Sequence, residues 1–333
     1  MNISVIGAGS WGTTLAILLC DNGHNVKLWE YDKKNYDLLI SNNENTKFLP
    51  GIKFPNNLYV TNDLIESLNF SDIIINAVPT QFIRNTYKGI PNSLIENKII
   101  VNVAKGIEVN TLFRISEVFS DLFPNISKDN LLTLSGPSHA EEVSRKIPTA
   151  VVIASCEEVH AIMVQELFMN NYFRVYRTHD VVGVELGGAL KNVMAIGAGI
   201  IDGIGYGDNT KAALMTRGIF EISKIGKALG ADPKTFAGLS GIGDLIVTCS
   251  SKHSRNRFVG ENIGKGIKLN EIVSSMNMVA EGVETAKSAY NLAAKLNVEA
   301  PIINEVYQVL FHDKNPHDAI DDLMNRDMKA EIY

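Results

Sequence analysis

A lysine lies in the middle of an otherwise small and apolar segment, "VELGGALKNVMAIGAGIIDG", at residues 184–203. The spacing of the apolar residues predicts a helix, on which Gly188 and Ala195 share a face with Lys191. Since that face carries only hydrogens and methyl groups, backbone or ligand can come close to the ammonium. Two interpretations stay open: a lysine that extends along its own stem to the surface, or a functional cation in a groove.

A second stretch, "VIGAGSWGTTLA", carries glycines in the spacing Gly7-x-Gly9-x-x-Gly12. It follows the first predicted strand and opens a helix, which is the context in which this spacing binds a dinucleotide. Gly7 permits a tight turn, Gly9 lets the backbone approach a pyrophosphate, and Gly12 lets the helix pack on the strand. The N–H groups at the start of the helix attract the phosphate charge. Glu30 ends the next predicted strand, 18 residues beyond Gly12, near where an acid that binds the ribose is expected.

Two further stretches place polar residues beside glycines. In "NVAKGIE", Lys105 follows the C-terminal end of a predicted strand, where ligands bind in open α/β sheets. In "SGPSHAEEV", a strand ends at Gly136 and a helix is expected to restart, with Ser138 and Glu141 as a capping box. The N–H groups of that helix start could bind an anion or a carboxamide.

The stretch "GLSGIGDLIVTCSSKHSRNRF" carries Asp244 and Thr248, followed by Ser254, Arg255 and Asn256. The Ser-Arg-Asn run predicts another helix start. The guanidinium of Arg255 and the neighbouring N–H groups would then form a cradle for phosphate. Taken alone, Arg255 would be interpreted as a surface residue.

Short β-branched runs alternate with helical patterns through the first half of the chain. Strands are predicted at residues 3–7, 25–30, 58–61, 72–78, 98–104, 131–135, 150–155 and 173–178. Helices fill most of the gaps, for example at residues 11–22 and 159–170. Runs that are apolar on both faces and separated by helices indicate a mainly parallel sheet covered on both sides.

After residue 180 the strand signals stop. Helical periodicity continues at residues 181–203, 210–230, 282–296, 301–312 and 317–325. The sequence therefore predicts an N-terminal α/β, Rossmann-like, doubly wound domain that binds a dinucleotide, at residues 1–185. An all-α domain is predicted to follow at residues 186–333.

The composition predicts a folded cytoplasmic protein. The chain has 333 residues, of which 45% are hydrophobic and 20% charged, with a net charge of -6. No basic field is available for nucleic acid or an anionic membrane. The segment around Lys191 is too rich in glycine and too interrupted by charge to predict membrane insertion, and the N-terminus lacks the features of a signal peptide. Cys20, Cys156 and Cys249 lie far apart, which fits a reducing compartment without disulfides or a zinc site.

Eight stretches together resemble one known family. "GAGSWGTTLA", "KFLPG", "VAKGIE", "SGPSHAEEV", "ALKNVMAIGAGI", "NTKAALMTRG", "GIGDLIVTC" and "SRNR" occur in the order and spacing of NAD(P)-dependent glycerol-3-phosphate dehydrogenases, as far as about Arg326. The resemblance implies interconversion of dihydroxyacetone phosphate and sn-glycerol 3-phosphate with NAD(P)H, which supplies phospholipid synthesis. It also implies a homodimer whose helical domain binds the substrate and joins the subunits.

The resemblance also implies roles for single residues, with Lys191 as the catalytic lysine. On the substrate side it implies Lys105, Gly136, Lys191, Asn192, Asp244, Thr248, Ser254, Arg255 and Asn256, and Ser138 joins them as a candidate from its own stretch. On the cofactor side it implies Ser10, Trp11, Tyr31, Phe48, Phe82, Lys105, Ala140, Arg255, Val279 and Glu281, which add to Gly7, Gly9 and Gly12 of the glycine loop. No metal is implied, and the seven histidines show no metal-ligand spacing.

The chemistry agrees with a catalytic lysine. Hydride delivered to a ketone builds alkoxide charge on the ketone oxygen. A lysine in a desolvated pocket can donate a hydrogen bond to that oxygen and supply the proton. Burial lowers the pKa of a lysine, which suits reversible proton transfer near neutrality.

The segment "WEYDKK" after the second predicted strand favours NAD over NADP. Glu30 and Asp32 would repel a 2′-phosphate, and no arginine occupies Tyr31 or Asp32. Lys33 and Lys34 weaken this argument, because either side chain could swing over to the phosphate.

Two other functions stay open. One is a related hydroxyacid or 6-phosphogluconate-type dehydrogenase with the same two-domain plan. The other is a catalytically silent dinucleotide sensor, against which Lys191, Asp244 and Arg255 argue, because a sensor needs neither a phosphate cradle nor an acid–base group.

Four other residues near these motifs also have more than one interpretation. A nucleophilic Cys249 would imply four-electron oxidation, but no partner histidine is evident, so a small buried hydrophobe is favoured. Lys211 and Arg217 could line the site or a dimer interface. Asp202 lies eleven residues after Lys191 on nearly the same helix face and could support it.

Overall fold

The computed structural model describes residues 1–276, 278–328 and 330–331. Eight strands form one sheet in the order β3-β2-β1-β4-β5-β6-β7-β8. They are β1 (Asn2–Ile6), β2 (Asn25–Trp29), β3 (Leu58–Thr61), β4 (Ile73–Asn76), β5 (Ile99–Asn102), β6 (Leu131–Ser135), β7 (Thr149–Ala154) and β8 (Phe173–Thr178). Neighbouring strands are parallel except for β6 and β7, which are antiparallel. The predicted doubly wound, mainly parallel sheet is therefore confirmed.

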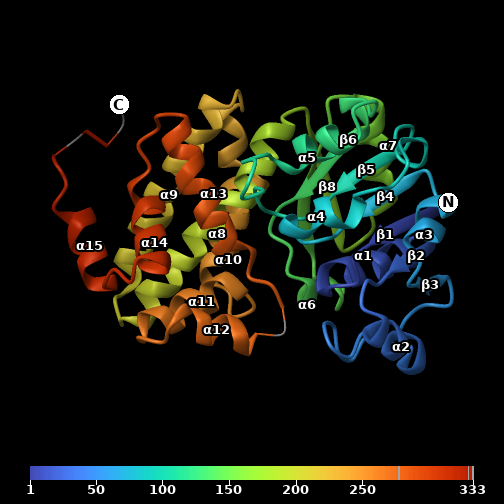
Figure 1. The fold of residues 1–333 in the computed structure, drawn as a ribbon, viewed down its shortest axis with the longest axis horizontal. Coiled ribbons are helices and arrows are strands. Elements are labelled where there is room, and N and C mark those ends of the chain that lie inside the picture. Colours follow the sequence, from blue (N-terminus) through green and yellow to red (C-terminus); the bar gives the residue numbers. More distant parts are fainter. Residues whose placement is uncertain (277, 329, 332–333) are drawn as a thin grey trace.

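Helices cover both faces of this sheet, as the α/β half of Figure 1 shows. They are α1 (Ser10–Asp21), α2 (Lys33–Asn42), α3 (Leu64–Phe70), α4 (Thr80–Tyr87), α5 (Ile115–Leu122), α6 (Ala140–Val143) and α7 (Glu158–Phe168). Neighbouring residues of β1 point to opposite faces, so Val5 packs in the core under α1 and α7, whereas Ile6 packs in the core under α4 and α5. Burial on both faces explains why the strands are continuous apolar runs.

The glycine loop between β1 and α1 has the geometry that its spacing predicts. Gly7 has a φ of +110°, and a Cβ on it would lie 2.9 Å from the carbonyl of Ala77. A Cβ on Gly12 would lie 2.0 Å from the backbone oxygen of Gly7, so only glycine lets α1 start this close to the strand. Around Gly9, by contrast, a Cβ would meet nothing within 4 Å. Gly7 and Gly12 thus shape the turn, and Gly9 leaves space above it.

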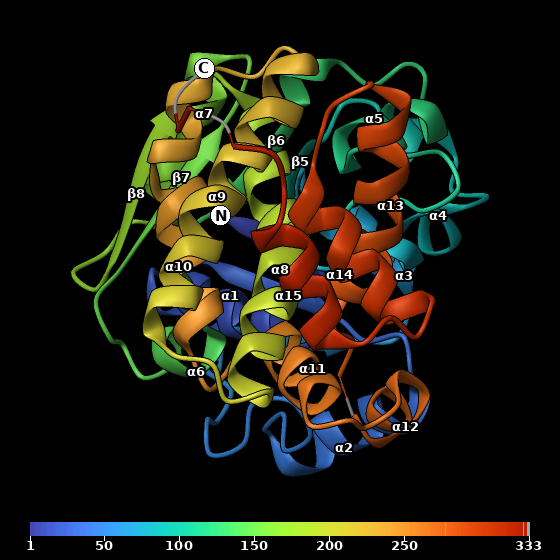
Figure 2. The same cartoon turned by 90° about the vertical axis from the view of Figure 1, so that its left-hand side faces the viewer.

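From residue 181 onward the described part of the chain is helical. Its helices are α8 (Val181–Gly203), α9 (Asp208–Ala228), α10 (Asp244–Ser250), α11 (Arg255–Gly264), α12 (Leu269–Ser275), α13 (Glu281–Lys295), α14 (Pro301–Phe311) and α15 (Pro316–Met324). In Figure 2, α8 is the central helix of this half, with the others around it. By length and composition α8 could cross a membrane, but its most apolar window is entirely buried within the protein. Such burial is typical of a central core helix.

The predicted elements agree with the structure, with a few exceptions. All eight strands and the five long helices after residue 180 lie within two or three residues of their predicted bounds. Helices α10 and α12 were not predicted. The predicted boundary at 185/186 falls inside α8, which runs on without a break, so the division into domains there stays a prediction.

The capping box predicted for α6 is wrong. His139, not Ser138, precedes the first helical residue, and no side chain caps the helix. The hydroxyl of Ser138 instead donates to the backbone oxygen of Gly136, 2.9 Å away. The serine therefore closes the turn after β6, because a short hydroxyl prefers a nearby carbonyl to a helix that starts one residue later.

Candidate active site

A cavity of about 280 Å³ lies where the carboxyl ends of the parallel strands face the helical half. Most of the residues implied for substrate and cofactor line it. They are Gly9, Ser10, Trp11, Gly12, Phe48, Lys105, Ser138, Ala140, Lys191, Asn192, Thr248, Ser254, Arg255, Asn256, Val279 and Glu281. The cavity therefore joins the glycine loop to the motifs of the helical half, at the edge of the sheet where ligands bind in open α/β folds.

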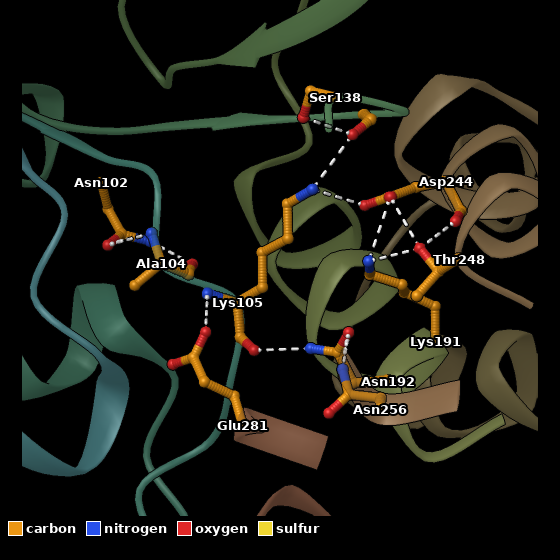
Figure 3. Close-up of polar contacts among 11 residues, drawn as sticks. Asn102, Ala104, Lys105, Ser138, Lys191, Asn192, Asp244, Thr248, Asn256 and Glu281 are labelled. Atoms are coloured by element: carbon orange, nitrogen blue, oxygen red, sulfur yellow. Dashed lines mark hydrogen bonds and ion pairs between the residues drawn. The ribbon is translucent and has the colours of Figure 1, made fainter. Parts of the chain in front are cut away.

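Lys191 is buried in the wall of this cavity and does not reach the surface. Its side chain is 8% exposed, and its Nζ lies 2.6 Å from the hydroxyl of Thr248 and 3.1 Å from a carboxylate oxygen of Asp244 (Figure 3). Burial lowers the pKa of Lys191 to about 8, although the attraction of Asp244 opposes this shift. The interpretation of Lys191 as an exposed surface lysine is therefore wrong.

The glycines before Lys191 explain how α8 enters the centre of the protein. A Cβ on Gly187 would lie 2.5 Å from the backbone oxygen of Ser240, and one on Gly188 would lie 2.8 Å from the hydroxyl of Ser135. The stem of Lys105 passes over Gly188 as well. The face of α8 that carries only small residues thus packs closely against other segments of the chain. This packing determines how deeply Lys191 is buried.

Asp244 bridges two lysines in the cavity wall. Its second carboxylate oxygen lies 2.7 Å from the Nζ of Lys105, which also donates to the backbone oxygen of Gly136 at 3.0 Å (Figure 3). Burial by itself would raise the pKa of Asp244, but the ammonium groups of Lys105 and Lys191 outweigh it and hold the pKa below its ordinary value. Two cations around one carboxylate leave this part of the cavity positive.

A chain of amides connects the walls of the cavity. The side-chain nitrogen of Asn192 donates to the backbone oxygen of Lys105, and that of Asn256 donates to the side-chain oxygen of Asn192, each at 2.9 Å. The side-chain oxygen of Asn256 accepts from the backbone N–H of Gly282, also at 2.9 Å. Both asparagines therefore hold three segments of the chain together at the cavity.

The helix start predicted at Ser254 is confirmed. Its side chain caps α11 by accepting a hydrogen bond from the backbone N–H of Arg257 at 3.2 Å. Arg255 follows at the first helical position and lines the cavity, and its guanidinium donates to the backbone oxygen of Val279 at 2.9 Å. An arginine and the N-terminus of a ten-residue helix therefore lie together at the cavity.

The structure places only some of the residues implied for cofactor binding at the cavity. The carboxylate of Glu281 lines the cavity and accepts hydrogen bonds from the backbone N–H and hydroxyl of Thr80, both at 2.8 Å, which ties α13 to the start of α4. Tyr31 and Phe82 are exposed side chains outside the cavity lining. Glu30 is buried, and its two carboxylate oxygens accept from the backbone N–H of Asp32 and the side-chain amide of Asn35.

Three residues at or beside the cavity were missed by the sequence analysis. His139 and His253 line the cavity, and burial lowers the pKa of His139. Neither histidine lies in a metal or triad spacing, so sequence patterns could not distinguish them from surface residues. Asn45 is fully buried and donates to the backbone oxygen of Ala8 and the hydroxyl of Thr13, both at 2.8 Å, which braces the glycine loop.

The structure decides the interpretation of Cys249 and gives the partners of Lys211, Arg217 and Asp202 within the chain. Cys249 is fully buried, and burial raises the pKa of its thiol to about 12, so it packs as a hydrophobe. Lys211 forms an ion pair with Asp202, and Arg217 donates to the backbone oxygen of Glu331. Within residues 1–276, 278–328 and 330–331, no three His, Cys, Asp or Glu side chains are grouped as a metal site requires.

Comparison with known proteins identifies the family. Residues 2–161 match the model of the NAD-dependent glycerol-3-phosphate dehydrogenase N-terminus, and residues 180–321 match that of its C-terminus. The chain belongs to the NAD-dependent glycerol-3-phosphate dehydrogenase family. The family resemblance of the eight motifs is thereby confirmed.

Three similar proteins carry the family name. A glycerol-3-phosphate dehydrogenase [NAD(P)+] of Chlorobium phaeobacteroides is 51% identical over 333 residues, which is 100% of both chains. One of Citrifermentans bemidjiense is 52% identical over 99% of this chain and 98% of its own. The crystal structure of glycerol-3-phosphate dehydrogenase from Coxiella burnetii has a TM-score of 0.93 and 34% identity, covering 98% of this chain and 99% of that one.

Proposed function

We propose that this protein is an NAD(P)-dependent sn-glycerol-3-phosphate dehydrogenase that interconverts dihydroxyacetone phosphate and sn-glycerol 3-phosphate, and so supplies phospholipid synthesis. One observation carries the proposal. A buried ammonium, that of Lys191, lies in the same cavity as the glycine loop and the Arg255 end of α11. A dinucleotide, a reacting oxygen and a phosphate each have a matching group there.

Lys191 is the proton donor in this proposal. An ammonium has three N–H donors, and Thr248 and Asp244 accept two of them. The third is directed to the carbonyl oxygen of dihydroxyacetone phosphate, stabilises the alkoxide charge that develops there, and then supplies the proton. In the reverse direction the neutral amine accepts the proton of the alcohol. Asp244, itself held by Lys105, keeps the Lys191 side chain in place.

The phosphate binds at the start of α11. Arg255 and the free N–H groups of the first turn provide charge-assisted donors, and the partial positive charge of the helix end adds to them. The ammonium groups of Lys105 and Lys191 increase the positive potential of the cavity, which suits a substrate that carries two negative charges.

The residues of the glycine loop fit a dinucleotide. The space where a Cβ on Gly9 would lie is open, and the N-terminus of α1 points its N–H groups at it. Gly9, Ser10, Trp11, Phe48 and Ala140 would hold the cofactor from the α/β half, and Val279 and Glu281 from the helical half. When bound, the nicotinamide supplies or accepts the hydride.

Substrate specificity tests this function. The purified protein should oxidise NADH with dihydroxyacetone phosphate at a far higher kcat/KM than with unphosphorylated dihydroxyacetone or with 2-keto acids. Faster turnover of a keto acid, or of 6-phosphogluconate with NAD(P)+, would favour a related dehydrogenase instead. Dinucleotide binding without turnover of any of these substrates would indicate a sensor.

NADH should be preferred over NADPH. Glu30 is held at the end of β2 by Asp32 and Asn35, so its charge stays where a 2′-phosphate would lie. Lys33 lies 2.9 Å from Asp37 within α2, a contact that directs it along the helix. Comparing kcat/KM for the two cofactors tests this preference, and equal values or a higher value with NADPH would contradict it.

The proposal also includes a homodimer in the cytoplasm. Residues 208–217 of α9 include Ala212, Ala213, Leu214 and Met215, but none of them is fully buried in the single chain. A partly exposed apolar stretch of helix such as this one is suited to packing against a second subunit. The cysteines support a reducing compartment, since Cys20, Cys156 and Cys249 are all free thiols.

A further inference from the structure

Asp202 connects the three helices α8, α9 and α11. It lies in the last turn of α8, where one carboxylate oxygen accepts from Nε of Arg257 at 2.7 Å and Nη2 at 2.6 Å. Its other oxygen forms an ion pair with Lys211 of α9. The three side chains are only 16–19% exposed, so solvent screens these contacts less than it screens ion pairs at the surface.

Both members of the Asp202–Arg257 pair lie at the unfavourable end of their own helix. Asp202 is an anion at the C-terminus of α8, where the helix dipole is negative, and Arg257 is a cation in the first turn of α11, where it is positive. Neither charge is favourable to the dipole of its own helix, although Arg257 also pairs with Glu261 one turn further along α11, at 3.3 Å. The pair therefore acts between helices, by joining the end of α8 to the start of α11.

The backbones of α8 and α11 cross in direct contact beside this pair. A Cβ on Gly199 would lie 2.0 Å from the backbone oxygen of Arg257, and one on Gly260 would lie 2.0 Å from the backbone oxygen of Ile196. This contact sets the distance between the helices. Because glycines have no side chains that interlock, this contact restricts the sliding and rotation of α11 against α8 less than larger side chains would. The Asp202–Arg257 pair restrains both movements.

The same two helices carry the two ends of the proposed substrate site. Lys191 lies on α8, and Arg255 lies two residues before Arg257 in the first turn of α11. The side chain of Arg255 lines the cavity, whereas that of Arg257 is held at Asp202 and does not. A shift of α11 along α8 would change the separation between the ammonium and the phosphate cradle.

We propose that Asp202 is a positioning residue for recognition of the substrate phosphate. Through Arg257 it holds the first turn of α11 in the register in which Arg255 faces the cavity that contains Lys191. This inference rests on the proposed function, in which Arg255 binds the phosphate. Asp202 touches neither substrate nor cofactor, and it acts only through the position of α11.

The first test is Asp202→Asn, which keeps the size of the side chain and removes its charge. With NADH saturating, KM for dihydroxyacetone phosphate should rise by about tenfold while kcat stays within about threefold, because the phosphate contacts are misplaced. kcat/KM for unphosphorylated dihydroxyacetone and Kd for NADH should change by less than about twofold. Asp202→Glu keeps the carboxylate and should recover most of the rise in KM.

A second variant breaks the pair from the other helix. Arg257→Met should show the same division between KM and kcat, which keeps the inference testable if Asp202→Asn does not fold. Glu305→Gln is the matched control, because Glu305 pairs with Lys314 in the same half of the protein and is also largely buried, with 12% exposure. It should lower Tm without raising KM.

The outcomes separate this inference from the proposed function. If Asp202→Asn and Arg257→Met leave KM within about twofold, or lower kcat/KM equally on both substrates, the inference is wrong. A rise in KM with Glu305→Gln would also overturn it, since general loosening would then suffice. Arg255→Ala is measured beside them, and if it fails to distinguish the two substrates, the assignment of the phosphate site itself is wrong.

Discussion

Replacing Arg255 by alanine should lower kcat/KM for dihydroxyacetone phosphate by about 2–5 kcal/mol, on the order of thirty- to several-thousandfold. The guanidinium lies at the cavity beside the capped N-terminus of α11, and its contact with the backbone oxygen of Val279 holds it there. Removing it leaves the phosphate with backbone N–H groups and one fewer charge-assisted donor. Steady-state kinetics at saturating NADH measure this loss.

Two comparisons show whether the loss in kcat/KM comes from binding of the phosphate. With unphosphorylated dihydroxyacetone the loss should shrink, since no phosphate remains to be bound. Lys265→Ala removes an exposed cation at the other end of α11, where it pairs with Glu261, and should change kcat/KM by less than about twofold. An equal loss on both substrates for Arg255→Ala would show that Arg255 has another role, such as holding the segment around Val279.

The sheet and the long helices were predictable because their signals are local. A buried strand such as β4 is apolar at nearly every position, and α8 is continuous in composition, so neither depends on knowledge of its neighbours. The glycine loop was predictable for a similar reason. Gly7 and Gly12 are required by contacts within one strand–turn–helix unit, apart from the close approach of Ala77.

The short elements around the site were less predictable. The turn Leu239–Gly243 contains Gly241 at φ -97° and ψ -105°, outside helical geometry, so no periodicity marks the start of α10. The pattern Ser138-x-x-Glu141 predicted a capping box that the structure does not contain, because the serine bonds within the turn before the helix. Short sequence signatures fail where two local hydrogen-bonding options compete.

The partnerships within the site could not be derived from sequence spacing. Lys105, Lys191 and Asp244 were each marked by their own stretch, but the bridging of two ammonium groups by one carboxylate depends on tertiary structure. The contact between Glu281 and Thr80 joins residues 201 positions apart. Composition and periodicity carry no information on such pairs, and the family resemblance supplied the site residues without their contacts.

Lys191→Met should lower kcat by about three orders of magnitude or more. General acid–base catalysis contributes roughly 10²–10⁴-fold, and the lost stabilisation of the alkoxide adds to it. Methionine keeps most of the stem volume, and Asp244 keeps Lys105 as its charge partner, 2.7 Å away. The variant should therefore fold and bind NADH nearly as the parent does, which a thermal melt and a Kd measurement check.

A control separates the loss of this ammonium from the loss of any buried titratable group. Glu221 is also buried in the helical half, where it accepts hydrogen bonds from the backbone N–H groups of Ile302 and Ile303. Glu221→Gln should change stability and leave kcat within about twofold, because Glu221 does not line the active-site cavity. Turnover of Lys191→Met within about tenfold of the parent would contradict the catalytic assignment.

The pH dependence tests the same lysine without a mutation. Because burial lowers the pKa of Lys191 to about 8, the ammonium predominates below that pH and the amine above it. Reduction needs the ammonium, so its kcat/KM should be level below about pH 8 and fall by about tenfold per unit above it. Oxidation needs the amine, so its kcat/KM should rise through the same pH and then become level.

A surface lysine, with its ordinary pKa near 10.4, would place neither transition there. Two opposite profiles with a shared midpoint are therefore the signature of one buried group that gives the proton in one direction and takes it in the other.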